Sequence, residues 1–246
     1  MILLFTDYGW QAAYVGQLKA AIYTVSRAAA VIDLQHDAPI FNPRAAAYLL
    51  ASLIDFLPAD ALILAVVDPG VGDVARRPLV MKADGRYYVG PDNGIFNVIA
   101  KQASRVEFWR IDWQPSGLTK TFHGRDLFAP VAAMLDQGDK PELARLEAEK
   151  IGFSDWSSEL AEVIYIDNFG NVISGLKGAS VSTDMRVHLG EREVCYAETF
   201  SAAGEGEGFW HINANGLVEI AVNQGTAALA YNLKIGDPVY MYQTEV

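Results

Sequence analysis

The 246-residue chain has little cysteine, few basic residues and no long apolar run. Its one cysteine, Cys195, has no partner for an internal disulfide, which favours a reducing compartment, and we expect it to be a small buried side chain. The 19 lysines and arginines are outnumbered by 30 acidic residues, so the net charge of −11 argues against wrapping nucleic acid. The longest apolar stretch, 61–67, is far shorter than the roughly 20 residues of a membrane span. The apolar N-terminus lacks a basic leader, and we expect a strand there in a cytoplasmic protein without a nucleic-acid or membrane partner.

The first half of the chain alternates strand and helix patterns. Hydrophobic residues make up 51% of the sequence, enough for a folded core. We expect strands at 2–5, 30–34, 61–67, 79–83 and 87–89, and helices at 14–26, 43–56, 96–103 and 127–137. The run at 61–67 is apolar on both faces, as in parallel strands covered by helices. This half is therefore predicted to be an α/β domain with a mostly parallel, layered sheet.

The second half has a different character. A polar, turn-rich stretch at 152–158 predicts a linker between domains at 1–152 and 159–246. Beyond it, short β-branched segments alternate with turn signals. The expected strands are 162–167, 172–174, 185–189, 193–196, 217–222 and 239–242. This spacing is typical of a small all-β barrel or sandwich.

Polar residues follow several predicted strands of the first half. Asp7, His36 and Asp68 each lie one or two residues past an apolar run, and the segments 92–94 and 123–126 add further polar groups. Ligands bind at the carboxyl ends of strands in such sheets, so these points are candidates for one site. Each also has a purely structural interpretation. Asp7 and 92–94 suit turns, His36 suits a loop histidine satisfied by backbone, and 125–126 suits an ion pair at a helix start.

The loop at 68–72, Asp-Pro-Gly-Val-Gly, is the most informative of these segments. Its glycines allow backbone to approach a ligand closely, and Arg76 and Arg77 follow it. A general base needs a pKa near the working pH, and histidine is the side chain that meets this requirement most easily. His123 can therefore take a proton from water. Asp68 can orient the base or balance its charge, and Arg76 can hold the resulting hydroxide.

An ordered set of motifs covers almost the whole chain. The set comprises TDYG at 6–9, DLQH at 33–36, VDPGVG at 67–72, PDNG at 91–94, TFHGRDLFAP at 121–130, IDNFGN at 166–171, EIAVN at 219–223 and GD at 236–237. In this order the motifs resemble those of the S-adenosyl-L-methionine (SAM) hydroxide adenosyltransferases, hydrolase relatives of the fluorinase and chlorinase. The resemblance implies an α/β domain and a β-barrel domain in a homotrimer, with active sites between the N-domain of one subunit and the C-domain of its neighbour.

The implied reaction is attack of water or hydroxide on the ribose C5′ of SAM, which yields adenosine and L-methionine. The sulfonium is already a good leaving group, so the resemblance implies neither metal nor other cofactor. It assigns water activation to Asp68, Arg76 and His123. The substrate contacts that it implies are Asp7 at the ribose hydroxyls, Phe41 and Phe122 as walls, the Gly124 N–H near the nucleophile, Asp167 at the methionine amino group, Phe169 and Asn171 at the adenine, and Asn215 in the barrel motif.

Three positions depart from the family pattern. The loop after Asp68 is one residue longer than usual, so Arg77 is an alternative to Arg76. An aspartate and a serine that would meet the methionine part are replaced by Ala12 and Ala214. A lost charged contact weakens binding by about 1.5–3 kcal/mol when its partner stays buried. We therefore hypothesise weakened methionine recognition, or a different group on the 5′ sulfur.

Three other functions remain open from the sequence. A halogenase of the same superfamily would carry tyrosine in place of Asp68 and Tyr-Ser in place of His123-Gly124, and a carboxylate would repel a halide. A metallohydrolase would use Asp7, His36, Asp68 and His123, although no tight two-histidine motif supports it. The chain is also compatible with a non-catalytic protein that binds nucleosides.

Overall fold

The computed structural model describes residues 1–73, 75–147, 156–190 and 192–243, which fall into two compact units. The first unit comprises residues 1–47 and 56–156, and the second comprises 48–55 and 157–246. Most of the predicted linker, residues 152–155, lies outside the described residues. The exact domain boundaries therefore stay a prediction. No helix in the described part of the chain is long and apolar enough to span a membrane.

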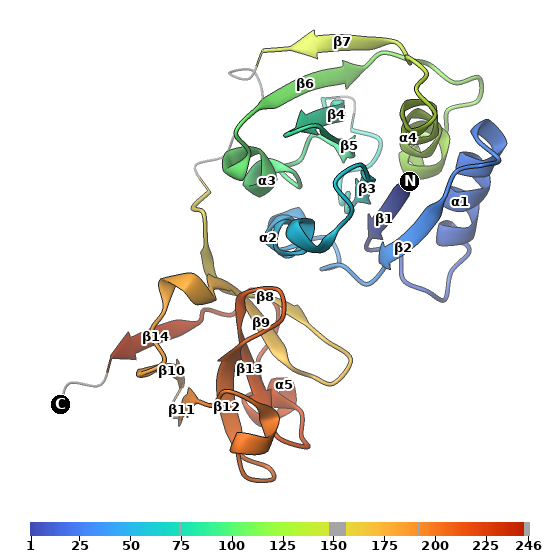
Figure 1. The fold of residues 1–246 in the computed structure, drawn as a ribbon. Coiled ribbons are helices and arrows are strands. Elements are labelled where there is room, and N and C mark those ends of the chain that lie inside the picture. The colour runs from blue at the N-terminus through green and yellow to red at the C-terminus, as the bar shows by residue number, and fades with distance from the viewer. Residues whose placement is uncertain (74, 148–155, 191, 244–246) are drawn as a thin grey trace. The chain divides into compact units, whose positions relative to one another are not determined.

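The first unit is a layered α/β unit built on a seven-stranded sheet (Figure 1). Its strands are β1 (Ile2–Thr6), β2 (Val31–Gln35), β3 (Leu62–Val66), β4 (Pro78–Ala83), β5 (Arg86–Pro91), β6 (Val106–Ile111) and β7 (Leu143–Leu146). Its helices are α1 (Tyr14–Val25), the first part of α2 (Pro43–Leu53), α3 (Asn97–Gln102) and α4 (Ala129–Asp136), with a π turn at Gly124–Phe128. The rest of α2 and most of the 3-10 turn at Ile54–Phe56 are grouped with the second unit. Figure 1 shows α1 and α4 on one side of the sheet and α2 and α3 on the other.

The sheet is mixed, which corrects the prediction of a mostly parallel one. In the order β2-β1-β3-β5-β4-β6-β7, the pairs among β2, β1, β3 and β5 are parallel, and the pairs of β4 with β5 and β6, and of β6 with β7, are antiparallel. The cause is the tight turn at Asp84 and Gly85, because two strands joined by two residues can only pair antiparallel. The parallel half is nevertheless the half that ends at the candidate site.

Helix α2 begins as its sequence predicts. The Asn42 side chain accepts a hydrogen bond from the Ala45 N–H at 3.0 Å, and Pro43 occupies the first helical position. The last predicted turn is a separate 3-10 segment at Ile54–Phe56. Leu4, Leu64 and Phe128 lie fully or almost fully buried in the core, between β1, β3 and the π turn before α4. Burial of both sheet faces thus holds the carboxyl ends of β1 and β3 at fixed positions.

The second unit carries one curled, seven-stranded sheet. Its strands are β8 (Leu160–Ile166), β9 (Val172–Lys177), β10 (Met185–Leu189), β11 (Arg192–Tyr196), β12 (Gly208–Ile212), β13 (Leu217–Val222) and β14 (Tyr240–Gln243). Short helical segments lie at Gly178–Ser180, Phe200–Ala202 and Ala227–Ala230 (α5). The order is β14-β10-β11-β12-β13-β9-β8, and only β11 and β12 are parallel among the pairs that the described residues form.

This sheet curls far enough for its two ends to meet at one bridge. Glu162 in β8 and Pro238, just before β14, form an isolated antiparallel bridge. The indole of Trp210 is fully buried in the core inside the curl and donates to the Met185 carbonyl at 3.0 Å. The second unit is therefore built on one curled, mostly antiparallel sheet, whereas an all-β closed barrel remains a prediction.

The sequence did not predict three of the strands, and it predicted the wrong exposure for one side chain. Charged residues interrupt the apolar residues of β6 and β7, so neither strand carries a continuous apolar run, while β12 begins at the end of the glycine-rich segment 204–208. Cys195 is exposed, which corrects the expectation of a buried side chain. The reason is its place on β11, where side chains alternate between the two faces and Val194, not Cys195, points to the core.

Candidate active site

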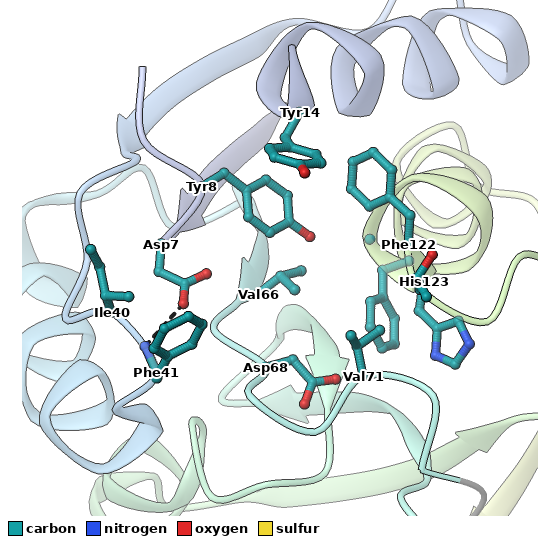
Figure 2. A pocket seen from close by; sticks show the side chains of 13 residues that line it. Asp7, Tyr8, Tyr14, Ile40, Phe41, Val66, Asp68, Val71, Phe122 and His123 are labelled. Carbon is teal, nitrogen blue, oxygen red and sulfur yellow. Dashed lines mark hydrogen bonds between the residues drawn. The ribbon is translucent and has the colours of Figure 1, made fainter. Parts of the chain in front are cut away.

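A cavity of about 360 Å³ lies where β1 and β3 end (Figure 2). The residues around it are Asp7, Tyr8, Tyr14, Ile40, Phe41, Val66, Asp68, Val71, Thr121, Phe122, His123, Gly124 and Phe128. Six of the predicted site residues are among them, contributed by four separate segments of the chain. Their convergence follows from the topology, since neighbouring parallel strands bring their carboxyl ends to one edge of the sheet.

Asp7 is held at the rim of the cavity by the backbone of Phe41. The Phe41 N–H donates to Asp7 Oδ2 at 3.2 Å. Phe41 has a φ of +56°, unusual for a bulky residue, and its ring is 73% exposed. A strained aromatic residue beside a carboxylate is typical of a ligand-binding position. Burial raises the pKa of Asp7, the Phe41 N–H opposes that rise, and the nearby charge of Asp68 adds to it.

Asp68 forms an ion pair with Arg76, the first of the two candidate arginines. Arg76 Nη1 contacts Asp68 Oδ1, and only 6% of the Asp68 side chain is exposed. The same oxygen accepts the Gly70 N–H at 3.1 Å. Arg77 instead pairs with Asp92, its Nη2 lying 2.6 Å from Asp92 Oδ2. The two adjacent arginines thus have different partners, and Arg76 is the one paired with the cavity carboxylate.

The segment that carries Phe122, His123 and Gly124 is anchored from its far side. Arg125 donates to both oxygens of Asp126, at 2.5 and 3.1 Å, and to Gln17 Oε1 of α1 at 2.8 Å. Its guanidinium also lies 5.0 Å from the centre of the Phe122 ring. Burial raises the pKa of Asp126, but hydrogen bonds from Arg125 and Thr119 prevail and lower it to about 2. The interpretation as a structural ion pair therefore holds, and this pair fixes a wall of the cavity.

Tyr8 lines the cavity, although sequence reasoning did not select it. It follows Asp7 directly, and strand alternation gave no reason to expect both side chains on one side. The chain leaves β1 at Thr6, so the alternation ends there. The Tyr8 ring contacts the rings of Tyr14 and Phe122, at centroid distances of 5.8 and 5.7 Å. A polar aromatic residue immediately after a strand-end aspartate was the available signal.

His36 lies outside the cavity and is fully buried. Its Nδ1 is 2.7 Å from Thr6 Oγ1 and its Nε2 is 3.0 Å from Asp33 Oδ1, so side chains rather than backbone satisfy it. Burial raises the pKa of Asp33, but hydrogen bonds from Lys19 and His36 outweigh this and lower it. Both ring nitrogens are engaged, and the described residues include no group of three or more His, Cys, Asp and Glu placed to hold a metal ion. The ligand set of the metallohydrolase hypothesis is therefore not assembled.

The remaining predicted site residues belong to the second unit. Asp167 organises the turn between β8 and β9: its Oδ1 accepts the N–H groups of Phe169 and Asn171, both at 2.9 Å, and its Oδ2 accepts the Asn171 side-chain amide. The Phe169 ring is 78% exposed. Asn171 Oδ1 is buried and has no hydrogen-bond partner among the described residues. Asn215 lies in the β12–β13 turn, where its N–H donates to Asn213 Oδ1 at 3.0 Å.

Comparison with known proteins identifies the class. The chain matches the SAM hydroxide adenosyltransferase N-terminal domain over residues 2–145 and the C-terminal domain of the same family over 161–240. It therefore belongs to the SAM hydroxide adenosyltransferase family.

Individual relatives agree with this assignment. A protein of Thermus thermophilus named (R)-S-adenosyl-L-methionine hydrolase is 36% identical over 97% of this chain and 98% of its own length. A crystal structure of an uncharacterized conserved protein from Thermotoga maritima superposes with a TM-score of 0.88 at 34% identity, covering 99% of this chain and 100% of the other. A fluorinase of Actinopolyspora mzabensis is more distant, at 23% identity over 96% of this chain and 95% of its own length.

Proposed function

We propose that this chain hydrolyses S-adenosyl-L-methionine to adenosine and L-methionine. The observation that carries the proposal is the Asp68–Arg76 pair, whose nearly buried carboxylate lines the same cavity as His123, in a chain that shares 36% identity with a named SAM hydrolase. A cationic sulfonium suits a cavity with two carboxylates, and a histidine suits the removal of a proton from water near neutral pH.

The chemical step is a displacement at the ribose C5′. A water oxygen attacks C5′ while the C5′–S bond breaks, and the electron pair of that bond leaves on sulfur as the thioether of methionine. His123 takes one proton from the water and later releases it to solvent, while the other proton stays on the new 5′-hydroxyl of adenosine. Arg76 balances the Asp68 charge and favours hydroxide over water. Placing water in line with the C5′–S bond accounts for much of the acceleration.

Substrate contacts follow from the chemistry of each side chain. Asp7 accepts hydrogen bonds from the ribose hydroxyls, between walls formed by Phe41 and Phe122, and the Gly124 N–H lies near the nucleophile. On the second unit, the exposed Phe169 ring stacks on the adenine and the unsatisfied Asn171 Oδ1 accepts its amino group. Asp167 and Asn215 meet the amino-acid part.

The assembly, compartment and cofactor requirement belong to the same proposal. We infer a cytoplasmic homotrimer in which the second unit, closed as a β-barrel, completes the active site of a neighbouring subunit. The distribution of adenosine and methionine contacts over two units supports this arrangement. Neither a metal ion nor an organic cofactor takes part, because the sulfonium leaves unaided. The partner is the small-molecule substrate alone.

The halogenase alternative is disfavoured by charge. The Asp68 carboxylate, almost fully buried, would repel a halide in the same cavity. The fluorinase relative is also the more distant, at 23% identity against 36% for the hydrolase. A different group on the 5′ sulfur remains a second candidate, favoured by Ala12 and Ala214 at positions where the family carries polar contacts to methionine. Turnover of SAM with a KM typical of the family, without turnover of truncated 5′-thioadenosines, would exclude it.

Isotope incorporation tests the proposal directly. The protein is incubated with SAM in oxygen-18 water, and the nucleoside is examined by mass spectrometry. We expect adenosine with one oxygen-18 at the 5′ position, formed equally with and without a chelator. His123→Ala should lower the rate strongly, whereas His188→Ala, on the exposed side of β10, is the matched control. Halogenated adenosine that forms only with added halide, or no product at all, would refute the hydrolase assignment.

A further inference from the structure

The Tyr8 hydroxyl lies at the centre of the cavity, next to Gly124. A Cβ atom built on Gly124 would overlap the Tyr8 hydroxyl oxygen, so the glycine leaves room for it. Figure 2 shows the ring crossing the cavity from the Asp7 side, with its hydroxyl pointing toward the segment that carries Phe122 and His123. The two ring contacts, to Tyr14 and Phe122, fix that direction. The hydroxyl is therefore held in place before any ligand enters.

The same hydroxyl has no partner within the described protein. No hydrogen bond involves it there, although its backbone N–H donates to Thr6 Oγ1 at 3.3 Å. A phenol in a partly buried cavity normally pairs its O–H group, and an unmade hydrogen bond there is unfavourable. Burial raises the pKa of the Tyr8 hydroxyl, and the charges of Asp7 and Asp68 raise it further. Tyr8 therefore stays protonated at every pH at which the protein works, as a neutral donor directed at the cavity contents.

We propose that Tyr8 is a further catalytic residue, whose hydroxyl donates a hydrogen bond to the oxygen of the attacking water. This inference rests on the proposed hydrolase function and adds a donor to it. As the water loses its proton to His123, negative charge develops on its oxygen, and the Tyr8 hydrogen bond becomes stronger. An interaction that strengthens along the reaction lowers the barrier rather than merely binding the substrate.

The position of the hydroxyl favours the nucleophile over the ribose as its partner. It lies against Gly124, the neighbour of the candidate base His123, whereas the ribose is assigned to Asp7 at the opposite rim beside Phe41. These two possibilities differ in their kinetics. A donor to the nucleophile affects kcat, while a donor to a ribose hydroxyl, bound equally in substrate and transition state, affects KM.

The test compares Tyr8→Phe with the unaltered chain in SAM hydrolysis across the pH range. Phenylalanine keeps both ring contacts and removes only the hydroxyl. We expect kcat to fall roughly 10- to 100-fold, somewhat less than for loss of a strong oxyanion donor, with KM within about threefold. Tyr23→Phe, a partly exposed tyrosine on the same unit at α1, should behave like the unaltered chain.

A second variant guards against an effect on folding. In Gly124→Ala the added methyl group displaces the Tyr8 hydroxyl without removing it, and we expect a loss of kcat comparable to that of Tyr8→Phe. The melting temperature of Tyr8→Phe itself should equal that of the unaltered chain. Tyr8→Phe with kcat within twofold of the unaltered chain, or with a raised KM alone, would overturn the inference and leave the hydrolase function standing. An unaltered chain that produces no adenosine would overturn both.

Discussion

The guanidinium of Arg76 lies directly over the Cα of Gly70. A Cβ atom at Gly70 would come within 2.5–2.9 Å of the guanidinium atoms, so only glycine leaves the space in which Arg76 reaches Asp68. The backbone N–H of Gly70 also donates to the same carboxylate. The glycine of the 68–72 loop therefore serves the ion pair as much as the ligand, a role that its position in the sequence did not indicate.

Replacing Gly70 by alanine should separate Arg76 from Asp68. We expect kcat to fall by roughly 10- to 100-fold, the scale of one charge-assisted hydrogen bond of about 1.5–3 kcal/mol. Steady-state kinetics with SAM measures this change. Gly16→Ala is the matched control, because a Cβ at this α1 position would meet nothing within 4 Å beyond its chain neighbours and its own helix backbone, and it should leave kcat unaltered. Equal activity of both variants would contradict the importance of the pair.

The two arginines should differ in what their loss affects. Arg76→Lys keeps a charge but loses the planar donors facing Asp68, so kcat should fall at least about tenfold. Arg77→Lys alters the pair with Asp92 outside the cavity and should lower the free energy of unfolding by about 1 kcal/mol at most, with kcat nearly unchanged. Kinetics and urea unfolding of both variants distinguish these effects. The reverse pattern would make Arg77 the catalytic arginine.

Ionised Asp7 should lower the stability of the fold while it contributes to substrate binding. Because burial raises its pKa, ionised Asp7 destabilises the fold at neutral pH, and this penalty disappears as the pH falls through the raised pKa and the carboxyl takes up a proton. Asp7→Asn, which keeps an oxygen acceptor for the Phe41 N–H, should therefore be more stable than the unaltered chain at pH 7 and equal to it in acid. Its KM for SAM should rise roughly 10- to 100-fold.

Thermal unfolding at several pH values, together with KM, tests the Asp7 prediction. Asp55→Asn, in the 3-10 turn after α2, is the control for removal of one negative charge. A stability gain at Asp7 that persists unchanged below pH 3 would show that the charge is not its cause.

The pair Asp126–Arg125 should make the cavity wall sensitive to acid. The pKa of Asp126 is lowered to about 2 from its ordinary 3.8, so its stabilising contribution is complete above pH 4 and disappears as the pH falls toward 2. Asp126→Asn should lower the free energy of unfolding by about 1.5–3 kcal/mol at pH 7. The difference from the unaltered chain should shrink below pH 4. Urea unfolding at pH 7 and pH 3 measures it, and a constant difference would exclude the ion pair as the source.

Part of the fold was predictable because local pattern and burial agree there. The apolar run ending at Val67 produced β3 in the parallel half of the sheet, and Asn42 with Pro43 placed the start of α2. β6 and β7 were not predictable, because charged residues interrupt their apolar residues and they carry no continuous apolar signal. The order of the strands in the sheet depends on pairing between segments far apart in the sequence, which a local pattern does not encode.

The candidate site divides in the same way. By itself the sequence determined the chemistry, since carboxylates, an arginine and a histidine follow the ends of apolar strands, and it determined the family through an ordered set of motifs. The tertiary structure decided which groups meet. It paired Arg76 rather than Arg77 with Asp68, engaged both nitrogens of His36, and brought the Tyr8 hydroxyl against Gly124. The partner of each side chain depends on the path that the loop takes after its strand. That path is fixed only by the packing of the complete core.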